Sequence, residues 1–241
     1  MRTRTIAILL IVTSAILYAI HYAVFRDMHG IGYYLGLDLA LMPLEVLLVT
    51  IIIDRMLSAR EVIERRYKLN MVIGVFFSEV GQGLLRRMAD MAADQDAIAQ
   101  NAAVAPEWNE VQIRRAIEWT NGREFAIKPS PAYFGALRDF LREKREFMVR
   151  LLENPMLLEH EVFTDLLWAV FHLEEELSLH RHIDACSPDD LAHLSVDAER
   201  AYTVLLTQWL EYMIYLQRDY PFLFSLAART NPLRNDSPLE A

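Results

Sequence analysis

Residues 6–25 read IAILLIVTSAILYAIHYAVF and residues 31–53 read IGYYLGLDLALMPLEVLLVTIII, and these two apolar runs decide the fold class. A helix needs about 20 predominantly apolar residues to cross the hydrocarbon core of a bilayer. The two runs hold 20 and 23 residues, and the RDMHG segment between them is long enough only for a tight turn. The sequence therefore predicts an all-α membrane protein that begins with a transmembrane hairpin at residues 1–57.

A cleaved signal peptide is the alternative interpretation of the first run, because Arg2 and Arg4 resemble its positively charged start. The run is longer than an ordinary signal-peptide core, and a second apolar run follows almost at once. The best exit for a signal peptidase, at residues 17–19, has leucine where a small residue is needed. These features favour a spanning helix.

Basic residues flank the two runs and set the predicted orientation. They lie before the first run and after the second, at Arg2, Arg4, Arg55, Arg60, Arg65, Arg66 and Lys68. The turn carries only Arg26. The positive-inside rule then places both termini in the cytoplasm, in a multi-pass protein of the cell (plasma or inner) membrane. The effect of the basic residues at 55–68 on membrane orientation is enough to explain their presence. Recognition of anionic lipid by these residues is the less economical alternative.

Composition and charge exclude several classes of protein. Residues 1–70 carry eight basic and six acidic groups, or +2, whereas residues 71–241 carry sixteen and twenty-seven, or −11. An acidic body of this kind repels nucleic acid, so we expect no nucleic-acid partner. The single cysteine excludes a disulfide framework and a multi-thiolate metal site.

The part of the chain after the hairpin is expected to be a cytoplasmic helical bundle. All eight glycines lie at or before position 135, and no alternating strand pattern bounded by turn residues occurs. We expect a membrane-proximal helix at 58–94, a linker at 95–106, a bundle at 107–230 and a flexible tail at 231–241. Within the bundle, starts and stops predict helices over 107–120, 130–154, 155–183 and 188–219, then about one turn after Pro221.

Helical spacing predicts which faces are buried. The membrane-proximal helix should bury Ile73, Phe76, Phe77, Val80, Leu84, Met88 and Met91, and the last long helix Leu194, Ala198, Ala201, Leu205, Trp209 and Met213. Gly74 and Gly81 share a face where a neighbour can approach closely. The aromatic-rich segment 215–233 is either a partner-docking surface or a return contact to the membrane-proximal helix, and the second is favoured because chain ends stay ordered only when they are held down.

Two acids within the second run are the main candidate site. Asp38 and Glu45 are seven residues apart, hence nearly on one face of a helix, and Glu45 falls at the midpoint of the run. An acid at that depth costs several kcal/mol on insertion scales and usually faces a bundle interior or water. In an antiparallel hairpin His21 would lie near the depth of Asp38, and Thr13 and Ser14 near the depth of Glu45.

Two interpretations of these acids remain open. They either line a cation or proton path formed by several hairpins, or Glu45 is a protonated acid hydrogen-bonded to Ser14 or Thr13 that fixes the helix register. Pro43 removes a backbone donor between them, where the helix can kink. Gly32 and Gly36 form a GxxxG pair that permits close helix packing.

No catalytic, metal or cofactor site is expected in the body. Its histidines, at 160, 172, 180, 182 and 193, include none with a glutamate three residues before it, as a di-metal helical bundle needs. Asp190 precedes His193 by three residues, but it should instead cap a helix after Ser187. Cys186 lies near His182 without a third group to orient a nucleophile.

The sequence favours a membrane-anchored, non-catalytic helical module that self-associates, forming a homo-oligomer in the lipid bilayer, and presents its bundle to a cytoplasmic protein partner. The alternative is an oligomeric cation- or proton-conducting membrane protein in which Glu45 and Asp38 line the path. Two spans per chain cannot enclose a pore, so conduction requires an oligomer.

Overall fold

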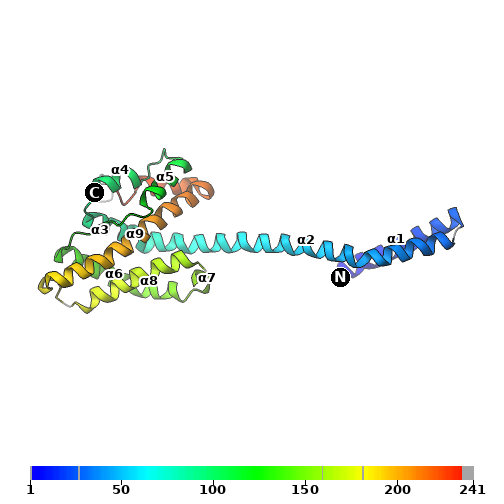
Figure 1. Cartoon of the computed structure of the whole chain (residues 1–241), viewed down its shortest axis with the longest axis horizontal. Helices are drawn as coiled ribbons and strands as arrows, with labels where there is room; N and C mark the ends of the chain where they lie inside the picture. Colours follow the sequence, from blue (N-terminus) through cyan, green and yellow to red (C-terminus); the bar gives the residue numbers. More distant parts are fainter. Residues whose placement is uncertain (1, 27, 159, 181, 235–241) are drawn as a thin grey trace. The chain divides into compact units, whose positions relative to one another are not determined.

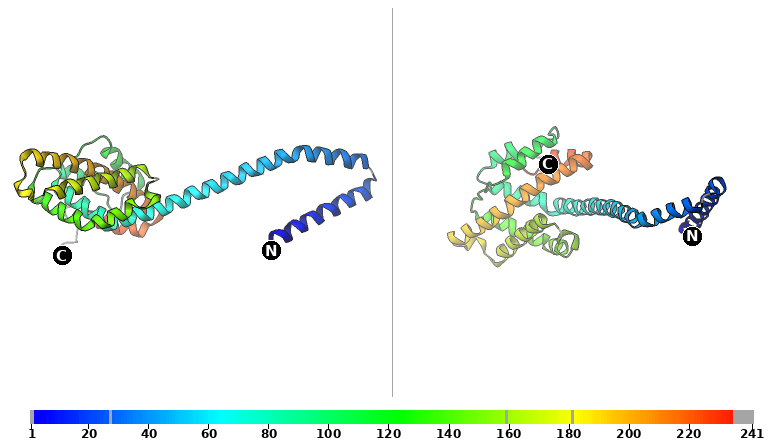
Figure 2. Two further views of the ribbon diagram at one scale, coloured as in Figure 1. Left: turned by 90° about the horizontal axis from the view of Figure 1, so that it is seen from below. Right: turned by 45° about the vertical axis from the view of Figure 1, so that its right-hand side comes forward.

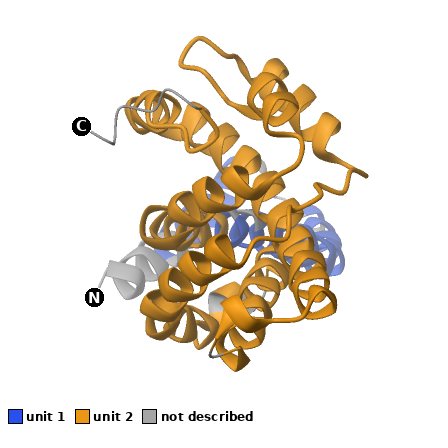
Figure 3. Ribbon diagram, turned by 90° about the vertical axis from the view of Figure 1, so that its left-hand side faces the viewer, with its two compact units in different colours: residues 1–63 blue, residues 64–241 orange. Residues whose placement is uncertain are grey.

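The computed structural model describes residues 2–26, 28–158, 160–180 and 182–234, and it divides into two compact units, residues 1–63 and 64–241 (Figure 3). No strand forms in these described residues. The only pairing of extended backbone among them is an isolated bridge between Ala92 and Ile127. The prediction of an all-α protein is therefore confirmed.

Both apolar runs form helices. Helix α1 covers Arg2–Phe25 and α2 covers Met28–Phe76. Arg26, between them, has a φ of 46°, and the chain reverses there so that α1 and the first part of α2 run in opposite directions (Figure 2). Pro43 does not interrupt α2, which the structure shows as one helix through this position.

The predicted helix at 58–94 is part of a longer helical run that changes its winding. After α2 comes a π-helical turn, η1 (Phe77–Gly81), and then α3 (Gln82–Met91). All seven positions predicted to be buried on this segment, from Ile73 to Met91, are buried.

Two glycines of this segment are crowded, but only Gly74 meets a neighbouring helix, as was predicted for both. A Cβ built at Gly74 would lie 2.9 Å from the hydroxyl oxygen of Tyr212, and one at Gly81 would lie 2.4 Å from Cδ1 of Phe77. The neighbour at Gly74 is the end of a side chain on another helix. The neighbours at Gly81 are the rings of Phe76 and Phe77 on its own helix, which are fully buried and have little room to move.

Gly81→Ala should therefore lower the free energy of unfolding by about 1–3 kcal/mol, the usual cost of overpacking a core. Gly135→Ala is the matched control, because nothing lies within 4 Å of a Cβ at that helical position. It should raise stability by about 0.5–1 kcal/mol, since alanine favours helix more than glycine does. Thermal unfolding followed by circular dichroism measures both, and an unchanged midpoint for Gly81→Ala would contradict the packing argument.

The stretch expected to be a linker is partly helical, which corrects the prediction for 95–106. Helix α4 (Gln95–Ala102) buries Ile98 and Ala102. Its alanine-rich, weakly patterned sequence becomes a helix because α3 and α5 (Glu110–Thr120) lie against it. Asn109 starts α5 with a capping box in which its side chain accepts a hydrogen bond from the backbone N–H of Gln112.

The helix predicted at 155–183 is broken, and this is a second correction. Helix α6 (Pro131–Leu152) is followed by a short α7 (Pro155–Leu158), and then α8 (Glu161–Leu179) starts anew. A 3₁₀ turn, η2 (Ile183–Ala185), precedes α9 (Pro188–Asp219). Pro155 opens a helix as predicted, but His160 caps the N-terminus of the next one, so two helices replace one.

Helix α9 is the centre of the bundle. It packs against α5, α8 and α10 (Pro221–Arg229), and α8 packs in turn against α6 (Figure 1). All six residues predicted for its buried stripe, from Leu194 to Met213, are buried. The Ser187–Asp190 capping box that fixes its start is also formed.

The chain end folds back onto the helix that follows the apolar runs, as favoured from the sequence. The Tyr220 hydroxyl donates a hydrogen bond to the Tyr67 hydroxyl of α2 at 3.0 Å. Helix α10 is longer than the single turn expected. The predicted flexible tail, 231–241, is also corrected at its start, because Asn231 and Leu233 are buried and Asn231 Nδ2 donates to the Val104 carbonyl at 3.0 Å. Residues 235–241 lie outside the described residues.

Candidate functional site

Asp38 and Glu45 lie on α2 with exposed side chains. In the part of the chain that the structure describes, neither carboxyl makes a hydrogen bond or an ion pair. The two acids thus lie on one helix face, and the described residues supply no partner for either. The register contact proposed between Glu45 and Ser14 or Thr13 is not formed within one chain.

The other predicted polar and small residues do not gather around these acids. Thr13 and Ser14 are exposed on α1, and His21, half-buried on the same helix, has no ion pair with Asp38. Nothing described lies within 4 Å of a Cβ built at Gly32 or Gly36, so the GxxxG pair faces open space in the single chain.

One helical run of the described residues, Gly32–Met91, is long and apolar enough to cross a membrane. None of its most apolar 18-residue window is buried. The first run contributes only the shorter apolar helix Val12–Val24 among the residues whose side chains are described. The second predicted span therefore has a matching helix, whereas the complete hairpin stays a prediction.

The histidines of the body have structural contacts. His160 Nδ1 accepts a hydrogen bond from the backbone N–H of Phe163 at 3.1 Å and so caps α8. His172 and His193 flank the largely buried carboxylate of Asp197, with Nε2 to oxygen distances of 3.7 and 3.8 Å. Within the described residues, no group of three histidine, cysteine or acidic side chains is arranged to hold a metal ion.

The neighbour of Cys186 is His180, whose Nδ1 lies 3.4 Å from the thiol sulfur; His182 contributes only its backbone oxygen, at 3.8 Å. Partial burial, followed by the negative charges of Asp190 and Asp184, raises the pKa of the Cys186 thiol. A raised pKa keeps the thiol protonated and therefore poorly nucleophilic at neutral pH.

The most deeply buried charge of the bundle was not predicted from the sequence. Glu174 of α8 has 2% of its side chain exposed and forms an ion pair with Arg145 of α6, while the Ser178 hydroxyl donates to its Oε1 at 2.9 Å. This pair lies in a polar hollow of about 800 Å³ that Arg138, Arg142 and Glu175 also line. The three arginines share a helix face at positions i, i+4 and i+7, a signal that could have been found in the sequence.

Arg145→Ala should lower the free energy of unfolding by about 1–3 kcal/mol, because it leaves the Glu174 carboxylate buried with only Ser178 as partner. The expected loss is smaller than for a fully buried ion pair because 42% of the Arg145 side chain is exposed. Adding Glu174→Gln should restore part of the loss. Arg150→Ala is the control, since its pair with Glu146 is 71% and 80% exposed and contributes little. Urea unfolding compares them, and equal losses for Arg145→Ala and Arg150→Ala would refute this role.

The fold and its polar groups define a class of protein: an all-α chain with an N-terminal helical region, whose apolar helix is uncovered, and a C-terminal helical bundle. The chain belongs to the MJ1433 family. The family described as "MJ1433, N-terminal helical domain" matches residues 2–57, and that described as "Uncharacterized protein MJ1433, C-terminal helical domain" matches residues 65–229.

A relative from Methanocaldococcus jannaschii, "Uncharacterized protein MJ1433", is 40% identical over 232 residues, which cover 96% of this chain and 93% of the relative. The similarity therefore extends through both the N-terminal helices and the bundle. No solved structure matches the chain.

Proposed function

We propose that this protein is a membrane-anchored, non-catalytic helical module that self-associates in the cell membrane and presents its cytoplasmic bundle to a protein partner. The observation that carries the proposal is the uncovered apolar surface of α2. Every side chain described between Gly36 and Ile53 is exposed. A soluble monomer rarely exposes a continuous apolar patch of more than a few hundred Å², and the core helix of a soluble protein would be covered.

Charge supports the orientation. Arg55, Arg60 and Arg66 follow the apolar part of α2, and Arg2 and Arg4 lie at the start of α1, before the apolar run 6–25. The positive-inside rule assigns such flanking basic residues to the cytoplasmic side. The bundle carries a net negative charge, which speaks against nucleic acid as its partner.

Self-association is supported by the two acids of α2. A carboxyl inside a membrane needs a hydrogen-bond partner or water, and the described part of the single chain offers none to Asp38 or Glu45. A second copy supplies one, because the open faces at Gly32 and Gly36 leave room for a neighbouring helix.

The anchor is tested by expressing the full chain and washing the membranes with alkaline carbonate. We expect the protein to stay in the membrane pellet, and an alkaline phosphatase fused after Ala241, active only outside the cytoplasm, to remain silent. A matched control replaces Leu44, Leu47, Leu48 and Val49 by lysine, which should release the protein into the supernatant. Release of the unmodified protein would overturn the anchor, and an active fusion would overturn the orientation.

The unpartnered carboxyls also favour a second candidate function, an oligomeric path for cations or protons lined by Glu45 and Asp38. The two proposals differ in what Glu45 contributes: a hydrogen bond between chains in the first, and a charge in the second. Particle symmetry separates them further, because a ring with a central axis is needed for conduction and not for anchoring.

Glu45→Gln retains the shape and hydrogen bonding of the side chain but removes the charge. If Glu45 only joins chains, the variant should assemble and function normally, whereas Glu45→Leu should weaken assembly by about 1 kcal/mol per lost contact. If Glu45 lines a path, Glu45→Gln should assemble normally yet lose ion flux in liposomes. Native mass spectrometry and flux assays measure both effects, and Thr50→Val is the control in the same helix, since the Thr50 hydroxyl donates only to the Val46 carbonyl. Normal assembly and flux for both Glu45 variants would refute either role.

A further inference from the structure

An apolar groove lies on the bundle between the end of α2, the π-turn η1 and α10. It encloses about 710 Å³, and its walls include Met71 and Val75 of α2 and Leu223 and Leu226 of α10. These four residues are 38–51% exposed, although they belong to a unit with a well-buried core. Binding sites for small molecules have volumes of this size and a mostly apolar lining with a few polar groups.

The lining of this groove contains one charged side chain, that of Glu79 on η1. Glu79 is exposed, and its carboxylate makes no hydrogen bond or ion pair with the residues that the structure describes. The residues four positions before and after it, Val75 and Gly83, are uncharged. The groove therefore has a negative charge and no cation in its lining, so its complement is a ligand with a positive charge and an apolar body.

The groups next to Glu79 fit an ammonium ion in particular. Ser78 and Gln82 also line the groove, and each has a side-chain oxygen that can accept a hydrogen bond. A primary ammonium group carries three N–H donors and no acceptor. One carboxylate and neutral oxygens beside it can satisfy these donors.

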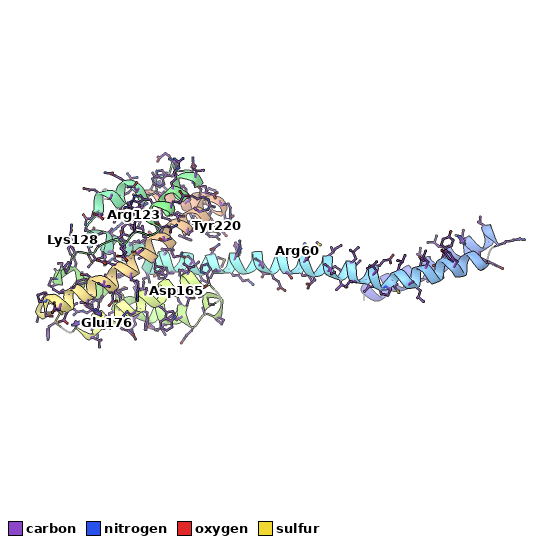
Figure 4. All side chains as sticks on the ribbon, in the orientation of Figure 1. Arg60, Arg123, Lys128, Asp165, Glu176 and Tyr220 are labelled. Carbon is purple, nitrogen blue, oxygen red and sulfur yellow. The ribbon has the colours of Figure 1, made fainter. Side chains whose placement is uncertain are left out.

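Tyrosine rings form a third part of the lining. Tyr212, Tyr215 and Tyr220, the last labelled in Figure 4, all line the groove. Their rings follow one another at centroid distances of 6.2 and 5.7 Å. The face of an aromatic ring is negative and attracts an organic cation. The rings and the carboxylate of the groove therefore favour the same sign of charge in a ligand.

We propose that this groove binds a primary alkylammonium ion, whose ammonium group pairs with the Glu79 carboxylate and whose alkyl chain lies along the four exposed apolar residues. Val75 and Met71 precede Glu79 by about 6 and 12 Å along the helix axis, a span that suits an alkyl chain of medium length. The proposal goes beyond the anchoring function and does not depend on it, because every residue involved belongs to the bundle.

Two other occupants fit less well. An alkyl carboxylate would place its charge in a groove whose only charged group is also a carboxylate. A basic helix of a protein partner would bring several positive charges, and the groove offers a counterpart to one of them. A small molecule with a single positive charge matches the lining group for group.

The test uses the full chain in the uncharged detergent dodecyl maltoside and a hexylamine probe with a photoactivatable diazirine near the end of its chain. After illumination and proteolysis, mass spectrometry should find the label on peptides that contain Met71–Val75 or Leu223–Leu226. Excess hexylammonium should compete for this labelling, whereas the same excess of 1-hexanol or hexanoate should compete much less, because both have the chain without the positive charge.

Glu79→Gln removes the charge and should raise the probe concentration for half-maximal labelling about 2- to 5-fold, the loss expected for one exposed ion pair. Glu118→Gln, at an exposed glutamate of α5, is the matched control and should leave this concentration unchanged. Leu226→Trp fills the groove and should remove most of the labelling, whereas Val196→Trp, at an exposed valine of α9, should not. Val75→Trp repeats the test from the other wall, so that a folding defect in one variant does not decide the result.

Several outcomes would overturn the proposal. They are labelling confined to residues 31–53, equal competition by 1-hexanol or hexanoate, equal effects of Glu79→Gln and Glu118→Gln, and full labelling of both tryptophan variants of the groove. Competition by a basic amphipathic leucine–lysine peptide but not by hexylammonium would also overturn it, because the groove would then bind a helix of a protein partner.

Discussion

Phe76 and Phe77 lie where α2 becomes a π-turn, and the packing of their rings ties α2 into the bundle. The Phe76 ring meets Phe163 of α8 edge to face at 5.2 Å, and the Phe77 ring stacks on Tyr212 of α9 at 5.1 Å. Both side chains are fully buried. Two consecutive residues of an ordinary α-helix point about 100° apart, so adjacent aromatic residues can hold two different helices at once. The arrangement requires glycine at position 81, because a larger residue would collide with both rings.

This junction also shapes the surface beside it. Tyr212 packs on Phe77 with its hydroxyl over Gly74, and the Tyr212, Tyr215 and Tyr220 rings follow one another along the end of α9 at centroid distances of 6.2 and 5.7 Å. Helix α10 then starts after Pro221, which fixes the backbone for a new helix and ends the old one. A groove lined by Met71 and Val75 of α2 and by Leu223 and Leu226 of α10 lies beside these rings, and Tyr212, Tyr215 and Tyr220 also line it.

Periodicity predicted the parts of this fold that depend on local pattern. The buried faces of 73–91 and 194–213 were correct because apolar residues recur at helical spacing in both segments. Helix α4 was missed because its helical form depends on contacts with α3 and α5 that no local pattern reveals. The break at His160 was missed because histidine is an uncommon cap.

The contacts Tyr67–Tyr220 and Arg145–Glu174 were not predicted. They join residues that are 153 and 29 positions apart, and such pairings are set by tertiary structure. Of the candidate site, the sequence located Asp38 and Glu45 on one helix face but not their lack of partners.

The carboxylates of the bundle and those of the apolar part of α2 differ in the partners that surround them. The buried carboxylate of Glu174 receives an arginine and a serine from its own chain, and that of Asp197 lies between two histidines. The acids of α2 receive no such partners in the described residues, although an apolar surface surrounds them. A carboxyl on such a surface is tolerated only where water, a proton or another molecule satisfies it. The described residues give the buried Glu174 carboxylate an arginine and a serine but give no partner to Glu45, and this contrast supports the proposal that the partner of Glu45 comes from outside the single chain.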